Sequence, residues 1–348
     1  MMAEESWFRS HLVARNYRAI AVELVRWEAE RGLVSIPALG NDPERALEEH
    51  PEVRVEYDTS PKAGCSVFGY YRPSLGGQAI IFIHPALTAE RDAFTIVHEY
   101  GHHVQRQHAQ WASVRHSLTT REGTKVEERV ADAFAAEVLI PATAIGEGSL
   151  TAAALSELYS AVRASRAAVA MRAAEIVASD EQATLVVLDR RGVVTFARAC
   201  GDDVFVPARG RVQHDLALMV SEAASRDGRA SGRLAGGLQF ASGWAQQDLR
   251  AEVALDETGT YAFGVIRPVQ RFGRKPVWER VEWECARTAC GLVFVVDETI
   301  EHCDRCDAPK CPDCSTCQCE PPQAAVCNGC FMELSSAERD DPSLHDCV

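Results

Sequence analysis

Residues 83–102 read IHPALTAERDAFTIVHEYGH, and the end of this run decides how the chain is interpreted. His98 and His102 are four residues apart, so on a helix both imidazoles lie on one face and can reach a single Zn²⁺. Glu99 lies beside them, where a carboxylate can take a proton from an attacking water. The pattern therefore predicts a helix that carries two metal ligands and a general base.

A second helix is predicted from about residue 125 to residue 140, and it ends at Pro141. Zinc sites that catalyse reactions keep three protein ligands and one open position. Glu128 and Asp132 share a face of this helix, so we expect Glu128 as the third ligand and Asp132 as the acceptor of a histidine N–H. Glu127 is the rival third ligand, and Glu122, on the preceding loop, is a weaker rival.

These residues carry a family resemblance. Residues 83–102 resemble the strand-to-helix core of the ImmA/IrrE metallopeptidases, and residues 128–141 resemble that family's second signature. The resemblance covers roughly residues 10–180. It implies a minimal zincin fold and endopeptidase activity, usually on a helix-turn-helix repressor whose cleavage induces stress-response or mobile-element genes.

The resemblance also assigns roles residue by residue. It implies that His98 and His102 are zinc ligands, that Glu99 is the general base and that Glu128 is the third ligand. Residues 155–172 are similar to the helix-turn-helix-like segment that follows the peptidase in this family. Residues 182–297 lie where its stress-response members carry a GAF-like sensor domain, and here position and strand pattern alone support the comparison.

The expected fold class is α+β, in four parts. These are a zinc metallopeptidase domain, a helix-turn-helix-like segment, a mixed α/β sensor-like module and a cysteine-rich zinc-binding tail, at residues 1–148, 149–180, 181–297 and 298–348. One helix is expected over residues 6–31, up to Gly32. The β-branched and apolar runs predict strands at 65–71, 78–84, 184–189, 193–197, 260–265 and 291–296.

Eight of the thirteen cysteines lie close together near the C-terminal end of the sequence. Their spacing is typical of two tetrahedral Cys₄ zinc sites, and such a segment would fold by binding metal. Iron–sulfur binding is the alternative, because three of them match part of a ferredoxin-type run. The eight are Cys303, Cys306, Cys311, Cys314, Cys317, Cys319, Cys327 and Cys330. The dispersed cysteines are expected to be buried small residues or bystanders: Cys65, Cys200, Cys285, Cys290 and Cys347.

Three further histidines near the motif, His103, His108 and His116, are expected at the surface. A zinc peptidase also needs a group that stabilises the oxyanion. Tyr70, Tyr71 and His116 are candidates that the sequence does not rank.

The net charge is −14, and residues 297–348 contribute −9 of it. An acidic chain repels the phosphate backbone, and the segment 151–178 has only three basic residues, so direct binding to nucleic acid is not expected. No apolar run is long enough to span a bilayer, and no secretory signal is recognisable, which predicts a cytoplasmic location.

The sequence thus predicts a zinc-dependent endopeptidase with one catalytic and two structural zinc ions, acting on a repressor or another regulatory protein. Two other functions stay open. One is a non-catalytic zinc-binding regulator or adaptor, and the other is a redox sensor with an iron–sulfur tail. Glu99 favours the enzyme, because a structural site has no use for a base beside an open coordination position.

Overall fold

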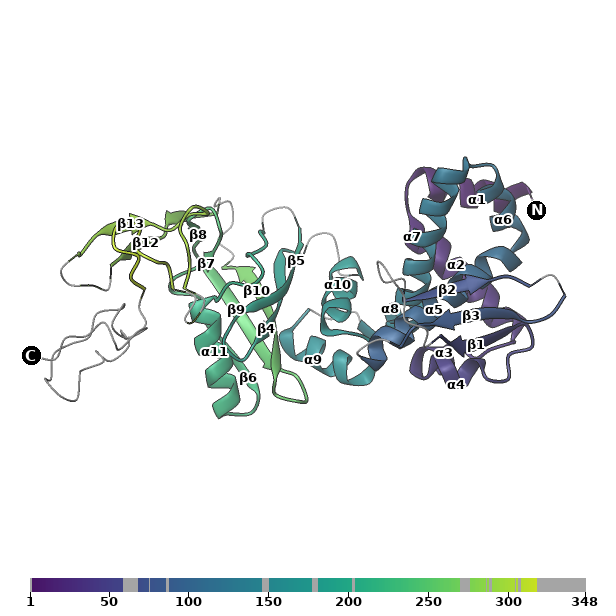
Figure 1. Cartoon of the computed structure of the whole chain (residues 1–348), viewed down its shortest axis with the longest axis horizontal. Helices are drawn as coiled ribbons and strands as arrows, with labels where there is room; N and C mark the ends of the chain where they lie inside the picture. Colours follow the sequence, from purple (N-terminus) through teal and green to yellow (C-terminus); the bar gives the residue numbers. More distant parts are fainter. Residues whose placement is uncertain are drawn as a thin grey trace, which may run out of the picture. The chain divides into compact units, whose positions relative to one another are not determined.

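The structure is a computed structural model in which the chain divides into two compact units. The first comprises Met1–Gly237 and Asp248–Pro276, and the second comprises Leu238–Gln247 and Val277–Val348. Figure 1 shows the course of the chain. The residues described are 2–58, 68–74, 76–85, 88–145, 150–176, 181–201, 204–269, 276–285, 287, 290–303, 305 and 308–317.

The first unit begins with two helices, α1 (Met2–Val13) and α2 (Tyr17–Arg31), where the sequence predicted one. The helix breaks at Arg15, whose φ is 54°, and the side chain of Asn16 caps α2 by accepting from the amide of Ala19. Gly32 ends α2 with a φ of 66°, as its position predicts.

A small three-stranded sheet follows, in the order β1-β3-β2. Strand β3 (Ala79–Ile83) is central and largely buried, with β1 (Val53–Tyr57) parallel to it and β2 (Gly69–Arg72) antiparallel at the edge. Two short helices, α3 (Ile36–Asn41) and α4 (Pro43–Leu47), precede β1. The polar composition of residues 35–61 gave no sign of these helices or of β1.

Two long helices pack against each other beside this sheet. They are α5 (Ala89–Gln107) and α7 (Thr120–Leu139), and α5 also packs on β2 and β3. Between them lies α6 (Ala109–His116), where the sequence predicted a loop. The side chain of His108 caps α6, and Trp111 anchors it in the core.

Three helices connect the first sheet and its helices to a second sheet. They are α8 (Ala142–Ile145), α9 (Ala152–Ala161) and α10 (Arg166–Ile176). Arg172 of α10 is buried, forms an ion pair with Glu137 of α7 and donates from Nε to the carbonyl of Ile140 at 3.1 Å. On the other side, Arg166 Nε donates to Asp256 Oδ2 at 2.7 Å.

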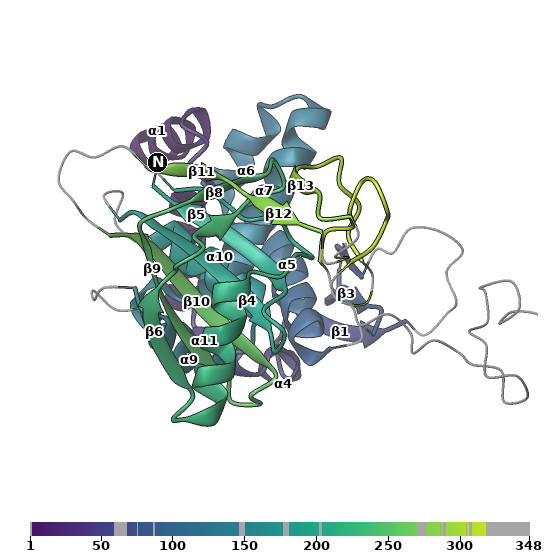
Figure 2. The ribbon, with the colours of Figure 1, turned by 90° about the vertical axis from the view of Figure 1, so that its left-hand side faces the viewer.

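The second sheet is five-stranded and antiparallel, in the order β5-β4-β10-β9-β6 (Figure 2). Strand β4 is buried along both faces; α9 and α10 pack on β4, β5, β9 and β10, and α11 packs on β6 and β9. The predicted strands at 184–189, 193–197 and 260–265 lie in this sheet, whereas β6 and β9 were not predicted. The bounds are β4 (Ala183–Asp189), β5 (Val194–Cys200), α11 (His214–Ser225), β6 (Arg229–Arg233), β9 (Leu249–Leu255) and β10 (Tyr261–Pro268).

The second unit contains short strands. A three-stranded sheet has the order β11-β8-β7, and a hairpin is formed by β12 (Glu282–Glu284) and β13 (Val293–Val295). The run 291–296 therefore belongs to this hairpin and not to the larger sheet, which corrects the prediction that placed it in the α/β module. The remaining bounds are β7 (Leu238–Gln239), β8 (Trp244–Gln246) and β11 (Trp278–Arg280).

The architecture is thus mixed α+β with several small sheets, as predicted. The helix-turn-helix-like and GAF-like details, and the four-part division, stay predictions. None of the helices in the described ranges combines the length and the apolar composition needed to cross a bilayer.

Candidate metallopeptidase site

Three possible metal ligands converge from α5 and α7. His98 Nε2 lies 3.4 Å from Glu128 Oε2, and His102 Nε2 lies 3.5 Å from Glu128 Oε1. The ligand atoms of all three residues lie within 4.8 Å of one another. Two imidazoles and one carboxylate are a donor set that zinc favours, so these residues fit the metal that the motif predicts.

The two rival glutamates are engaged elsewhere. Glu127 forms an ion pair with Arg115 of α6. Glu122 accepts from the hydroxyl of Thr119 at 2.7 Å, while Thr119 caps α7, so the two residues form a capping box. Of the three acidic residues, only Glu128 is grouped with the two histidines.

Asp132 lies one helical turn beyond Glu128 and contacts the other side of the His98 ring. His98 Nδ1 is 3.1 Å from Asp132 Oδ1, an approach off the line of an ideal hydrogen bond. Burial acts to lower the pKa of His98, but Asp132, Glu99 and Glu128 together raise it above its ordinary value. A carboxylate in this position orients an imidazole and leaves Nε2 directed at a metal.

His102 differs from His98 in the direction of its pKa shift. Burial and the neighbouring His98 lower the pKa of His102 to about 4, so its ring is neutral at physiological pH. A neutral imidazole is the form that ligates metal, because the lone pair on Nε2 is then available.

Glu99 is buried beside the ligands, with 8% of its surface exposed. Burial is the main cause that raises the pKa of Glu99 to about 7, and the carboxylate of Glu128 acts in the same direction. His98 and a hydrogen bond from the backbone of Tyr71 act in the opposite direction. A carboxyl group whose pKa lies near 7 can both accept and return a proton.

A cleft of about 600 Å³ opens over this group and is lined by β2, α5 and α7. The rings of Tyr70 and Phe94 and the guanidinium of Arg106 belong to its wall. On β2, the backbone of Tyr71 contacts Glu99, while its hydroxyl lies 3.2 Å from His103 Nδ1. The hydroxyl of Tyr71 is therefore engaged by a group outside the ligand set.

Residues 48–174 match the model of a peptidase family that is described as the IrrE N-terminal-like domain. Residues 48–174 are an ImmA/IrrE family domain. The resemblance predicted from the two motifs is confirmed, and the matched segment includes both α5 and α7 of the IrrE-like domain.

Comparisons with curated proteins and with solved structures support no further assignment. No curated protein matches the sequence. Among solved structures, a Mycobacterium tuberculosis transcriptional regulator is similar over 76% of this chain and 81% of its own, with 13% identity and a TM-score of 0.40. A likeness at this level does not establish a common fold.

Two of the three extra histidines are buried in the IrrE-like domain, which corrects the prediction that all lie at the surface. His103 is 1% exposed and joins Tyr71 to Glu52, whose Oε2 lies 3.1 Å from His103 Nε2. His108 is also 1% exposed and caps α6. His103 follows His102 by one position, so it points from the helix toward the sheet and not toward the cleft. His116 is exposed and does not line the cleft.

The predicted cysteine tail is only partly described. Cys303, Cys311, Cys314 and Cys317 lie in the described residues, whereas Cys306, Cys319, Cys327 and Cys330 lie outside them, as do Cys65 and Cys347. Cys200 is a buried free thiol, as a bystander would be.

Cys285 and Cys290, predicted as bystanders, lie instead within reach of Cys311 and Cys314. The sequence analysis missed this grouping because the two pairs are more than twenty residues apart, so that their spacing along the chain does not show it.

Proposed function

We propose that the IrrE-like domain is a zinc-dependent endopeptidase. The observation that carries this proposal is the arrangement of His98, His102 and Glu128 around one point, with the buried carboxylate of Glu99 beside them on an open cleft. Glu128 remains 54% exposed, so the group has room for a substrate, which a closed structural site lacks.

In the proposed peptide hydrolysis, the metal and the protein contribute different steps. A bound zinc ion supplies Lewis-acid polarisation of the scissile carbonyl and makes water more acidic. Glu99 takes the proton of the attacking water and then transfers it to the leaving amine. Its raised pKa fits both steps, because a weakly basic carboxylate would accept the proton less readily. The contact from Tyr71 on β2 keeps the carboxylate in place.

The cleft also suggests how a peptide would bind. Strand β2 is at the edge of its sheet, and it lines the cleft next to the metal ligands. An extended peptide could pair with this edge through backbone hydrogen bonds, with side chains directed alternately toward the wall of the cleft. A substrate segment must therefore be unfolded or locally extended, as in the linkers of regulatory proteins.

Following the family resemblance, the proposed substrate is a helix-turn-helix repressor or another regulatory protein in the cytoplasm. The sheet module and the cysteine-rich second unit would then sense a signal or position the substrate. The competing function is a non-catalytic regulator, in which the same residues hold metal without turnover.

Co-expression with each helix-turn-helix regulator encoded nearby tests the proposal. Mass spectrometry should find one regulator cut at a defined peptide bond only when the wild-type chain is present. The matched control is the Glu99→Gln chain, which retains the ligands and lacks the base. Equal fragments with both chains would refute the mechanism.

A further inference from the structure

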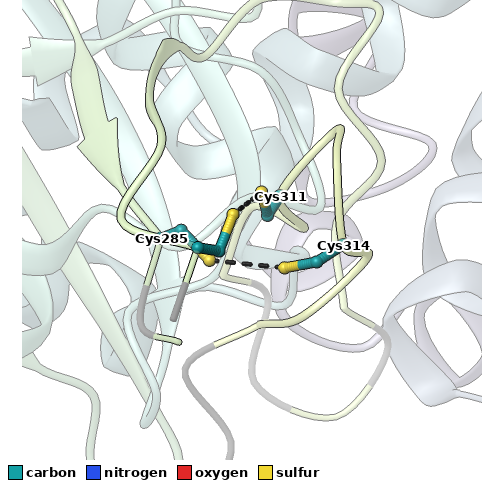
Figure 3. Close-up of side chains that lie close together, drawn as sticks. Cys285, Cys311 and Cys314 are labelled. Carbon is teal, nitrogen blue, oxygen red and sulfur yellow. Dashed lines mark hydrogen bonds between the residues drawn. The ribbon is translucent and has the colours of Figure 1, made fainter. Parts of the chain in front are cut away.

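Four cysteines of the second unit come together from two separate segments. Cys285 and Cys290 lie between the strands β12 and β13 of the hairpin, and Cys311 and Cys314 lie in the segment 308–317. Cys285 Sγ is 3.4 Å from Cys314 Sγ, and Cys290 Sγ is 3.7 Å from Cys311 Sγ. Figure 3 shows the side chains of Cys285, Cys311 and Cys314 directed toward one another.

A backbone hydrogen bond closes each of the two segments. In the hairpin, the amide of Cys285 donates to the carbonyl of Leu292 at 2.9 Å, which closes the loop beside the sulfur. In the second segment, the amide of Ser315 donates to the carbonyl of Cys311 at 2.8 Å, and Ser315 adopts a φ of 55°. Short backbone turns of this kind direct paired cysteine sulfurs toward one point.

The distances agree with a tetrahedral metal site. A zinc–sulfur bond of about 2.3 Å places the sulfurs of a tetrahedron about 3.8 Å apart. The four Sγ atoms all lie within 4.8 Å of one another, close to that spacing. Disulfides are about 2.0 Å long, so the observed pairs are too far apart to be bonded. A cluster of several irons would hold its cysteines farther apart than a single ion does.

The part of the second unit that the structure describes buries little apolar surface. Its buried residues within the described ranges are few and mostly small: Leu238, Gly243, Ala245, Gln246, Cys285, Ala308, Pro309 and Cys311. Two of them are members of the cysteine group. A domain with so little buried apolar surface needs a metal or another cross-link to fold.

We propose that Cys285, Cys290, Cys311 and Cys314 bind one structural zinc ion, which joins the β12–β13 hairpin to the segment 308–317. Four thiolates favour zinc and leave no open position, so this site is structural and not catalytic. The site pairs Cys311 and Cys314 with upstream cysteines and not with their neighbours in the tail. It is independent of the proposed peptidase activity.

Differential alkylation of the full chain tests the site without any substitution. Protein purified under reducing conditions is treated with a maleimide before and after removal of metal by a chelator, and the labelled peptides are identified by mass spectrometry. All four cysteines should be protected until the metal is removed. Equal labelling before and after chelation would overturn the proposal, and so would labelling that requires a reductant, which would indicate disulfides.

Metal content provides the second measurement. Cys285→Ser and Cys290→Ser should each lose one zinc ion per chain, whereas Cys200→Ser, the matched control in the first unit, should lose none. Cys290→His should retain the ion, because imidazole can replace a thiolate as a zinc ligand. Unchanged zinc in both serine variants would overturn the site, and iron in place of zinc would overturn the choice of metal. The Cys290→His variant separates loss of a ligand from failure to fold.

Discussion

His98 and Glu128 lie on different helices, thirty residues apart in sequence, yet Nε2 of one is 3.4 Å from Oε2 of the other. This contact depends on the packing of α5 against α7. It places an imidazole and a carboxylate close enough to ligate one cation together. The neighbouring glutamate, Glu127, also lines the cleft but forms an ion pair with Arg115.

Glu128→Gln should therefore abolish high-affinity zinc binding at the peptidase site, because an amide is a poor zinc ligand. Glu127→Gln is the matched control and should keep zinc, although it loses an ion pair. Elemental analysis of chains that carry Cys285→Ser, with and without each substitution, isolates this site. Zinc loss with Glu127→Gln and retention with Glu128→Gln would reverse the assignment of the third ligand.

Asp132→Ala should weaken zinc binding without removing a ligand. The Asp132 carboxylate lies 3.1 Å from His98 Nδ1 and orients the ring, and losing such a partner typically costs about 10–100-fold in metal affinity. Zinc titration in competition with a chelator measures the change. At saturating zinc, cleavage should recover substantially. An unchanged affinity would show that Asp132 does not act on His98.

Tyr71→Phe should leave catalysis within a few-fold of the wild type. Its hydroxyl lies 3.2 Å from His103 Nδ1, and only its backbone contacts Glu99. Loss of an oxyanion-stabilising group costs about 10²–10³-fold in kcat, so the two roles are easily separated. The variant should lose about 1 kcal/mol of stability, because a partly buried hydrogen bond is removed. Tyr70→Phe is the comparison, since Tyr70 also lines the cleft. A 100-fold loss with Tyr71→Phe would contradict the assignment.

The stability of the first unit should fall as the pH falls from about 6.5 to about 4, in part because of His50. Its Nδ1 accepts from the amide of Glu52 at 3.2 Å, and its Nε2 lies 3.0 Å from the hydroxyl of Tyr100. A second proton on the ring, at Nδ1, would remove the hydrogen bond from the amide of Glu52. Burial and the nearby His103 lower the pKa of His50 to about 4.

Over this pH range the unfolded chain therefore binds a proton that the folded chain does not bind, so acid favours unfolding. Denaturant unfolding at several pH values, compared between the wild type and His50→Gln, measures this contribution. The variant is expected to be less stable at pH 7.5 but to lose less stability on acidification. Equal pH dependence in the two proteins would show that His50 does not contribute.

The grouping of His98, His102 and Glu128 was predictable because helical periodicity is local. The spacing of His98 and His102 fixes their common face, and Glu128 with Asp132 repeats the same spacing on α7. The break at Arg15 was not predictable, because an apolar pattern continues through it. The burial of His103 was missed because its partners, Tyr71 and Glu52, come from distant segments.

The grouping of the four cysteines, in contrast, could not be predicted from the sequence. Close spacing favoured partners within the tail, but Cys285 and Cys290 lie more than twenty residues before Cys311. The folded chain places all four within reach of one another, and sequence spacing alone does not determine how cysteines pair on metals.

The central claim is that Glu99 acts as the base beside a zinc ion that it does not ligate. The most direct measurement compares zinc content and cleavage of a co-expressed regulator between the wild type and Glu99→Gln. The account predicts equal zinc in both proteins and a loss of cleavage of at least about 10²-fold in the variant. Cleavage at the wild-type rate by Glu99→Gln, with zinc retained, would contradict it.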